Sequence, residues 1–324
     1  MTPNETSPRL AAAIDVGTNT LRLLIGYPAE NGRVVRLVSA RSTTRLGRDL
    51  RLTSRLSSES VAKSIETLHS FKELCESHGT RRIAAVGTSA LREAGNSRDF
   101  LIAVQEKTGI TIRVISGEEE AELTLRGIRS SLPDEVSAGA RTELILDVGG
   151  GSTEWIVCAD EIRKGSLALG ALKLHEEFLR HDPPHEDEIA SMMESIIQHV
   201  ESSSLVQNLR PRTVSWPDLP LLVATGGTAT TVAAIDMQME RYDGDRLHMH
   251  RLPVGRVRKI FETLRALPLE KRRQVRGMEP ERADIIVAGI AVVLALMERL
   301  AIDEVTVSDY GILEGLLLVC MSEE

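Results

Sequence analysis

The chain contains the same pattern of elements twice, and this internal repeat restricts the fold more than any other feature of the sequence. Residues 11–27 (AAAIDVGTNTLRLLIGY) and 143–159 (ELILDVGGGSTEWIVCA) each read as an apolar strand, an Asp-Gly turn and a second strand. In each half a buried strand then runs into a Gly-Thr turn and a helix, at 82–94 and 221–235. The turns are similarly spaced, because Asp15 lies 72 positions before Gly87 and Asp147 lies 79 before Gly226. The repeat predicts two similar α/β domains that face each other across a cleft.

Periodicity places the remaining elements of the first half. Residues 34–39 and 110–115 are expected to be strands, 57–77 a helix with one apolar face, and Ser116 the start of a second helix. We expect the chain to change domain in the helix after Gly117. The first domain then comprises 1–124 and the second 125–300, and the C-terminal residues from about 301 to 324 return to the first.

Composition and charge exclude several function classes. The 324 residues carry a net charge of −8, so the whole molecule does not attract polyanions, and any phosphate-rich ligand must meet local arginines and backbone N–H groups. No aromatic-rich basic face indicates nucleic-acid binding. The longest apolar run, 285–297, is too short to cross a bilayer and predicts a buried helix. The first ten residues lack the pattern of a signal peptide, and Cys75, Cys158 and Cys320 form no CxxC, so we expect a cytoplasmic protein without membrane attachment. The sequence leaves open a homodimer.

Three polar loops predict a phosphate site. Glycines let backbone N–H groups approach an anion, hydroxyls follow them, and the third loop opens a helix whose free N–H groups favour anions. The predicted phosphate-binding residues are Gly17, Thr18, Asn19, Thr20, Gly149, Gly150, Gly151, Ser152, Gly226, Gly227 and Thr228. Asp15 and Asp147 end the strands that lead into the first two loops, where a carboxylate suits a hard cation or its waters. Any one loop alone could be only a turn, but three at matching positions favour the phosphate site.

An acidic cluster starts the helix after Ser116. Ser116 fits an N-cap and Glu119 the third helical position, which together make a capping box. Capping explains Glu119 but leaves Glu120 without a role.

Two basic stretches and a histidine pair are more ambiguous. Arg41, Arg45, Arg48, Arg51 and Arg55 could guide an anionic chain or could form a solvated surface, and the same holds for Lys271, Arg272, Arg273 and Arg276. His248 and His250 lack a third ligand at metal spacing, so we expect a structural role.

The chain resembles the exopolyphosphatase / guanosine pentaphosphate phosphatase family. The segments that carry the resemblance occur in family order and span nearly the whole chain: AAIDVGTNTLRLLI, RLGRDL, VGTSALREAGNSRDF, VISGEEEAELTLRGI, LILDVGGGSTEWIV, ATGGTATTVAAI, ERADIIVAGIAVVLALME and VSDYGILEG. The resemblance implies an α/β fold of duplicated actin-like ATPase (ribonuclease H-like) domains, with the active site in the interdomain cleft. The chain stops after the VSDYGILEG segment and so resembles the short, two-domain form.

The resemblance also implies residue roles. Glu120 matches the catalytic base, which would deprotonate a water that attacks the terminal phosphorus in line. Arg92 matches the active-site arginine, whose guanidinium can offset charge on a phosphoryl group. Asp147 and Glu154 match acidic positions near the metal and, with Asp15, are the expected ligands of Mg²⁺ or Mn²⁺.

The resemblance implies hydrolysis of the terminal phosphate of inorganic polyphosphate, and the same motifs fit removal of the 5′ terminal phosphate from guanosine pentaphosphate (pppGpp). A sensor that only binds polyphosphate or nucleotide is disfavoured, because binding alone does not require the base Glu120. A sugar or acid kinase of the same superfamily leaves the SGEEEA motif unexplained.

Overall fold

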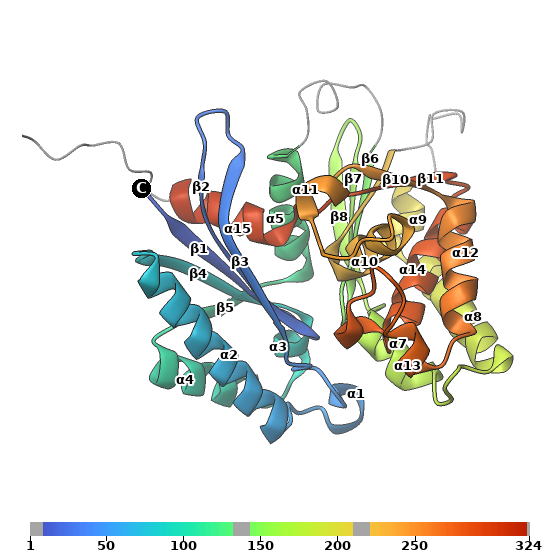
Figure 1. Cartoon of the computed structure of the whole chain (residues 1–324), viewed down its shortest axis with the longest axis horizontal. Coiled ribbons are helices and arrows are strands. Elements are labelled where there is room, and N and C mark those ends of the chain that lie inside the picture. The colour runs from blue at the N-terminus through green and yellow to red at the C-terminus, as the bar shows by residue number, and fades with distance from the viewer. Residues whose placement is uncertain (1–8, 132–142, 210–220, 323–324) are drawn as a thin grey trace, which may run out of the picture.

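The computed structural model of the protein describes residues 9–131, 143–209 and 221–322, which form two α/β units side by side (Figure 1). The first unit contains β1 (Ala11–Val16), β2 (Thr20–Pro28), β3 (Val34–Thr43), β4 (Arg82–Gly87) and β5 (Ile112–Val114), with α1 (Leu50–Thr53), α2 (Ser58–Ser77), α3 (Ser89–Glu93), α4 (Ser97–Thr108) and α5 (Gly117–Arg129). The second contains β6 (Glu143–Val148), β7 (Thr153–Cys158), β8 (Ile162–Leu167), β9 (Leu221–Thr225), β10 (His250–Pro253) and β11 (Glu304–Val307). Its helices are α7 (Ala171–Phe178), α8 (Glu186–Ser202), α9 (Ser204–Leu209), α10 (Gly226–Asp236), α11 (Gly244–Leu247), α12 (Val254–Arg265), α13 (Leu269–Arg272), the 3₁₀ turn η1 (Pro280–Arg282) and α14 (Ile286–Arg299). The last helix, α15 (Ile312–Ser322), returns to the first unit.

The two sheets repeat one topology. The first has the order β3-β2-β1-β4-β5, and the second has the order β8-β7-β6-β9-β11 with β10 added at the edge. In both sheets the first three strands along the chain form two antiparallel pairs. The next strand, β4 in the first sheet and β9 in the second, pairs parallel to the first strand of its unit, β1 or β6. The predicted duplication is therefore confirmed, with the actin-like (ribonuclease H-like) arrangement.

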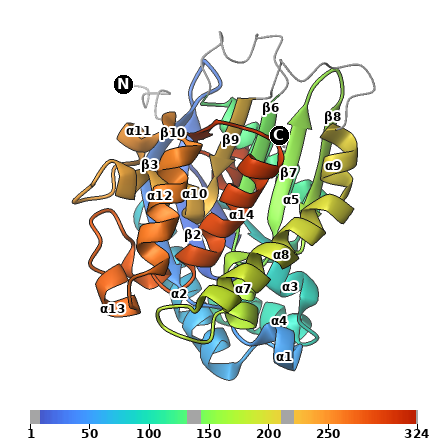
Figure 2. The ribbon, with the colours of Figure 1, turned by 90° about the vertical axis from the view of Figure 1, so that its right-hand side faces the viewer.

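The central strands are buried on both faces, as parallel neighbours require. On β1, Ala12, Ile14 and Val16 pack with helices α2 and α4, while Ala11 and Ala13 pack with α15. In the second unit α8, α10, α12 and α14 cover one face of the sheet (Figure 2). The apolar run at 285–297 lies in α14, whose residues 286–297 are all buried, so the predicted buried helix is confirmed.

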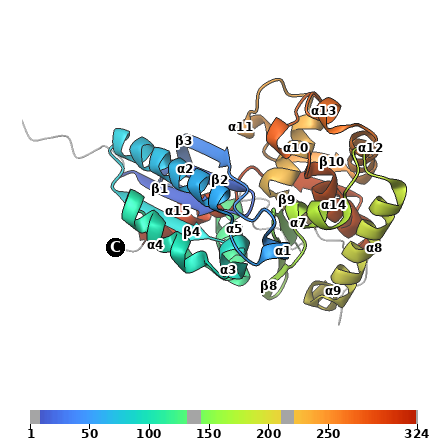
Figure 3. The same ribbon diagram turned by 90° about the horizontal axis from the view of Figure 1, so that it is seen from below.

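Helix α5 belongs to both units. Its Leu123 packs with the first sheet, whereas Ala121, Leu125 and Ile128 pack with Ile145 of the second. Seen from below, α5 lies at the junction of the units (Figure 3). The expected change of domain at 124/125 therefore falls inside one continuous helix.

The C-terminal return begins later than expected. Strand β11 pairs with β9 and β10 in the second sheet, although it lies within the residues expected to return to the first domain. Helix α15 contacts β1, β2 and α5. We propose a division in which the chain returns to the first unit at Ile312 rather than near residue 301.

Among the described ranges, no helix is long and apolar enough to cross a membrane.

Candidate active site

The three predicted loops meet at the carboxyl ends of the central strands. They enclose a cavity of about 60 Å³, to which both units contribute. The lining includes all the predicted phosphate-binding residues except Thr228, together with Asp15, Asp147 and Glu120. Because loops far apart in sequence converge on one small polar space, the arrangement suits a compact anion such as a terminal phosphoryl group.

Close approach of the loops explains their glycines. A Cβ placed on Gly151 would lie 2.5 Å from both the Ser89 Oγ and the Thr18 Oγ1, which belong to the opposite unit. Gly226 starts α10 with φ +83°, and a Cβ there would lie 2.3 Å from Asp147 Oδ1. Only glycine satisfies both the backbone conformation and the space at this position.

Thr228 is oriented differently from the other loop residues. It is buried, and its hydroxyl lies 3.4 Å from the carbonyl of Val148. A Cβ placed on Gly289 of α14 would lie 2.5 Å from the same hydroxyl. The structure therefore does not bring Thr228 to the cavity, and its assignment as a phosphate ligand is not supported by its position.

Glu120 lies at the cavity beside Arg92. Arg92 Nη1 donates to Glu120 Oε2 at 2.8 Å and to the carbonyl of Ile115 at 3.0 Å. Burial, and then the charge of Glu154, raise the pKa of Glu120 well above its usual value, against the effect of Arg92. A carboxylate with a raised pKa accepts a proton more readily near neutral pH, as a general base must. Arg92 itself does not line the cavity but reaches it through this contact.

The neighbouring Glu119 has the predicted local role. Its backbone N–H donates to Ser116 Oγ at 3.1 Å, and its Oε2 accepts from the Ser116 N–H at 3.2 Å. The capping box is confirmed, and it points Glu119 toward Arg113 rather than the cavity.

The two hairpins carry differently charged pairs at equivalent positions: an acidic and a basic residue in the first, and two acidic residues in the second. In the first, Asp15 pairs in register with Arg22, and Arg22 Nη2 lies 2.7 Å from Asp15 Oδ2. In the second, Asp147 pairs in register with Glu154, so two carboxylates share one face of the hairpin. Burial and the Asp147 charge raise the pKa of Glu154 to about 7, and burial raises that of Asp147. Two buried negative charges that face each other destabilise the fold, unless a proton or a cation compensates one of them.

These carboxylates fit a divalent cation that the substrate helps to hold. Asp15 Oδ1 is buried without a hydrogen-bond partner, so one carboxylate oxygen remains for a ligand. In the part of the chain that the structure describes, no group of three or more His, Cys, Asp or Glu side chains is arranged to hold a metal ion. Mg²⁺ commonly takes one or two carboxylates and completes its shell with phosphate oxygens and water. The assignment of Asp15, Asp147 and Glu154 as ligands stays a prediction.

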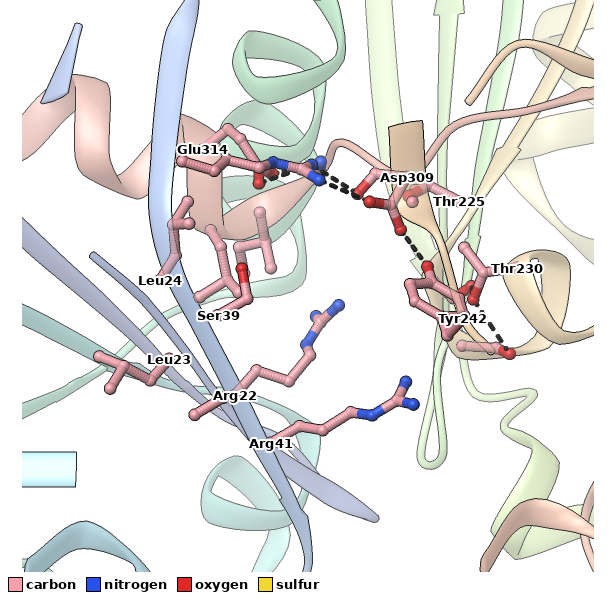
Figure 4. A pocket seen from close by; sticks show the side chains of 18 of the residues that line it. Arg22, Leu23, Leu24, Ser39, Arg41, Thr225, Thr230, Tyr242, Asp309 and Glu314 are labelled. Atoms are coloured by element: carbon pink, nitrogen blue, oxygen red, sulfur yellow. Dashed lines mark hydrogen bonds and ion pairs between the residues drawn. The ribbon is translucent and has the colours of Figure 1, made fainter. Parts of the chain in front are cut away.

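A second, larger cavity of about 370 Å³ adjoins the first (Figure 4). Both cavities are lined by Arg22, Gly226, Gly227 and Arg282, so the two spaces meet at a pair of arginines. Sequence reasoning missed both arginines. For Arg22 the signal was available, since a charged residue interrupts an apolar strand opposite Asp15; Arg282 reaches the site only through the packing of η1 against Gly227.

Two arginines of the first basic stretch form ion pairs with residues of the second unit. Arg41 Nη1 lies 2.5 Å from Glu279, and Arg45 Nη1 lies 2.6 Å from Asp284. Arg48, Arg51 and Arg55 are exposed. Arg41 and Arg45 thus join the two units by ion pairs, and neither the guiding role nor the solvated surface considered from the sequence predicted this contact.

One residue of the second basic stretch, Arg272, is turned inward. Arg272 is 2% exposed, and its guanidinium donates to the carbonyls of Leu264, Leu267 and Ala283. Its side chain therefore holds the ends of α12 and η1 together, whereas Lys271, Arg273 and Arg276 are exposed, and their role in guiding a substrate stays a prediction.

Each histidine of the pair hydrogen-bonds to a residue of another segment. His250 Nε2 lies 2.9 Å from Asp236 Oδ2, and His248 Nδ1 accepts from the Asp309 N–H at 3.4 Å.

Known proteins resemble this chain along nearly its whole length. A model of the Ppx/GppA phosphatase family matches residues 28–324. Exopolyphosphatase 2 of Mycobacterium tuberculosis is 33% identical over 320 residues, which covers 95% of this chain and 97% of that protein. The guanosine-5′-triphosphate,3′-diphosphate pyrophosphatase of Vibrio parahaemolyticus is 28% identical over 98% of this chain and 60% of its own length.

Solved structures show the same similarity. The Ppx/GppA enzyme of Aquifex aeolicus superposes with a TM-score of 0.76 at 31% identity and covers 96% of this chain and 99% of its own. An exopolyphosphatase from Cytophaga hutchinsonii superposes with a TM-score of 0.84 at 26% identity and covers 97% and 99%.

Proposed function

The chain belongs to the Ppx/GppA phosphatase family, and from that membership we propose that it is an exopolyphosphatase, which removes the terminal phosphate of inorganic polyphosphate. The observation that carries the proposal is the pair Glu120–Arg92 at a cavity built from three glycine-rich loops. An exopolyphosphatase and a pppGpp phosphatase are both phosphoanhydride hydrolases, so the reaction class does not depend on the choice of substrate.

The loops would hold the terminal phosphoryl group by backbone N–H groups and by the hydroxyls of Thr18 and Ser152. Glu120 accepts a proton from water as that water attacks phosphorus, and the P–O bond to the remaining chain breaks on the opposite side. Arg92 orients Glu120 through its 2.8 Å hydrogen bond and places positive charge near the reacting group. Asp15, Asp147 and Glu154 would hold a divalent cation, which we propose to be Mg²⁺ (or Mn²⁺), and when bound that cation would neutralise phosphate charge.

The test is phosphate release from polyphosphate and pppGpp compared side by side. We expect a higher kcat/KM for polyphosphate and loss of both activities with excess EDTA. A higher kcat/KM for pppGpp would overturn the choice of substrate, and full activity in EDTA would overturn the metal assignment. We place the enzyme in the cytoplasm, because its three cysteines form no CxxC motif and are typical of free thiols in a reducing compartment.

One observation favours the nucleotide as a second candidate. The larger cavity is lined by four arginines (Arg22, Arg36, Arg41 and Arg282) and by four carboxylates (Asp243, Asp245, Asp309 and Glu314), so its side chains supply no excess positive charge for a polyanion. Tyr242 also lines it, from the side opposite Arg22 and Arg41 (Figure 4). An aromatic ring can stack on a base and carboxylates can accept from its N–H edge. If the cavity holds a nucleoside, Tyr242→Leu will raise KM for pppGpp and leave tripolyphosphate hydrolysis unchanged.

A further inference from the structure

Glu154 is held by two hydroxyl groups, and one of them, that of Ser166, has no role in the proposed mechanism. It is 1% exposed, and its Oε1 accepts from Ser152 Oγ at 2.8 Å and from Ser166 Oγ at 2.8 Å. Ser152 belongs to the second glycine loop. Ser166 comes from β8, where it pairs in register with Glu154. Arg92 Nη2 lies 3.9 Å from the same oxygen, so several groups that favour a charged carboxylate converge on one atom.

Ser166 also contacts the start of the helix that carries Glu120. A Cβ placed on Gly117 would lie 2.6 Å from Ser166 Cβ, 3.1 Å from Ser166 Oγ and 3.9 Å from Glu154 Oε1. The φ of Gly117 is not in the left-handed region, so space and not backbone conformation requires glycine here. Glu120 follows Gly117 by three residues, less than one helical turn.

We propose that Ser166 is a positioning residue, whose hydroxyl orients Glu154 and whose contact with Gly117 sets the distance between Glu154 and the helix that carries Glu120. The proposal rests on the proposed function in one respect, namely that these two carboxylates serve catalysis. Sequence reasoning did not single out Ser166, because nothing in the pattern of β8 shows which strand it faces.

The first variant is Ser166→Ala. Ser166 is exposed on an edge strand, so we expect the thermal midpoint to stay close to that of the wild type. We expect kcat to fall by about 10-fold, as for other loosened supporting contacts, with KM nearly unchanged. In the Glu154→Gln background, Ser166→Ala should cause no further fall in kcat, because the hydroxyl then has no carboxylate to orient.

The second variant approaches the same contact from the helix. Gly117→Ala introduces a methyl group that would lie too close to Ser166, so we expect a similar fall in kcat with KM nearly unchanged. Gly255→Ala is the matched control, because a Cβ on Gly255, near the start of α12, meets no atom within 4 Å. The control leaves kcat and KM at wild-type values.

The outcomes separate the two proposals. If the wild type hydrolyses neither substrate, the proposed function fails, while a double-mutant cycle of Ser166→Ala and Glu154→Gln in urea unfolding still reports whether the hydroxyl and the carboxylate interact. If the wild type is active and Ser166→Ala leaves kcat unchanged, or lowers it by the same factor in the wild-type and Glu154→Gln backgrounds, Ser166 is not a positioning residue.

Discussion

Glu119 and Glu120 are neighbours in one acidic cluster but point to different partners. Glu119 closes the capping box with Ser116, whereas Glu120 reaches Arg92 at the cavity. One residue of a helix differs from the next by about 100° of rotation, so adjacent side chains cannot share a site.

Replacing Glu120 by glutamine removes the proton acceptor but keeps the size of the side chain. We predict a fall in kcat of about 10²- to 10⁴-fold with little change in KM, measured by phosphate release. Glu119→Gln is the matched control, since glutamine can complete a capping box and activity should remain close to that of the wild type. Normal turnover in a folded Glu120→Gln variant would exclude this residue as the base.

The buried pair Asp147–Glu154 predicts a pH-dependent stability. The pKa of Glu154 rises from 4.5 to about 7, which corresponds to about 3 kcal/mol if this carboxyl alone carries the effect. Because the pKa is raised in the folded state, the stabilisation is complete below pH 4.5 and is lost as pH rises through 7. Without metal, the free energy of unfolding should therefore fall more between pH 5 and pH 8 in the wild type than in Glu154→Gln.

Urea unfolding at the two pH values measures this difference. Mg²⁺ should restore stability at pH 8 in the wild type and should restore less in Glu154→Gln, because a bound cation compensates the charged pair. If the free energy of unfolding depends on pH in the same way in both proteins, the ionisation of Glu154 does not cause the loss of stability.

At the scale of elements, helices α5 and α15 cross at unusually short range. A Cβ on Gly127 would lie 1.8 Å from the Gly311 carbonyl oxygen, and one on Gly315 would lie 1.8 Å from that of Leu123. One helix leads toward the second unit and the other returns from it, so this crossing joins the two units. Glycine is needed at both positions because the two backbones approach so closely that a side chain has no room between them.

A methyl group at this crossing should be strongly destabilising. We predict that Gly315→Ala lowers the free energy of unfolding by about 1–3 kcal/mol or more, because backbone cannot move aside as a flexible side chain can. Chemical denaturation checks the value, and Gly255→Ala, which meets open space, should not be destabilised. A Gly315→Ala protein as stable as the wild type would show that the helices separate easily.

At the scale of the whole molecule, ion pairs join the two units. Arg41–Glu279, Arg45–Asp284 and Lys173–Glu93 each join the first unit to the second, at 2.5, 2.6 and 2.8 Å. A polyanion that enters the cleft can compete with these carboxylates for the arginines.

Asp284→Asn tests this competition. The amide removes the charge that pairs with Arg45, so we predict a lower KM for long polyphosphate at low salt and little change for a short chain. The difference should vanish near 1 M salt, where the Debye length is only about 3 Å. Glu270→Gln, which removes the partner of Arg273 in α13, is the matched control. If KM for long chains is the same in Asp284→Asn and the wild type, the substrate does not meet Arg45.

The sequence alone determined the features that repeat or that depend on near neighbours. Hydrophobic periodicity predicted the strands and helices, and the repeat predicted two facing units. The capping box of Ser116 and Glu119 is likewise local, and so was predictable.

Only the tertiary structure decided which distant groups meet. Arg282, Ser166 and the acidic partners of Arg41 and Arg45 arrive from segments whose approach depends on how η1, β8 and α5 pack, and no local period encodes that approach. The same packing turns Thr228 away from the cavity and keeps β11 in the second sheet. Strand and helix patterns fix the direction of a side chain along its own element, whereas the neighbour it meets is set by contacts between elements far apart in the chain.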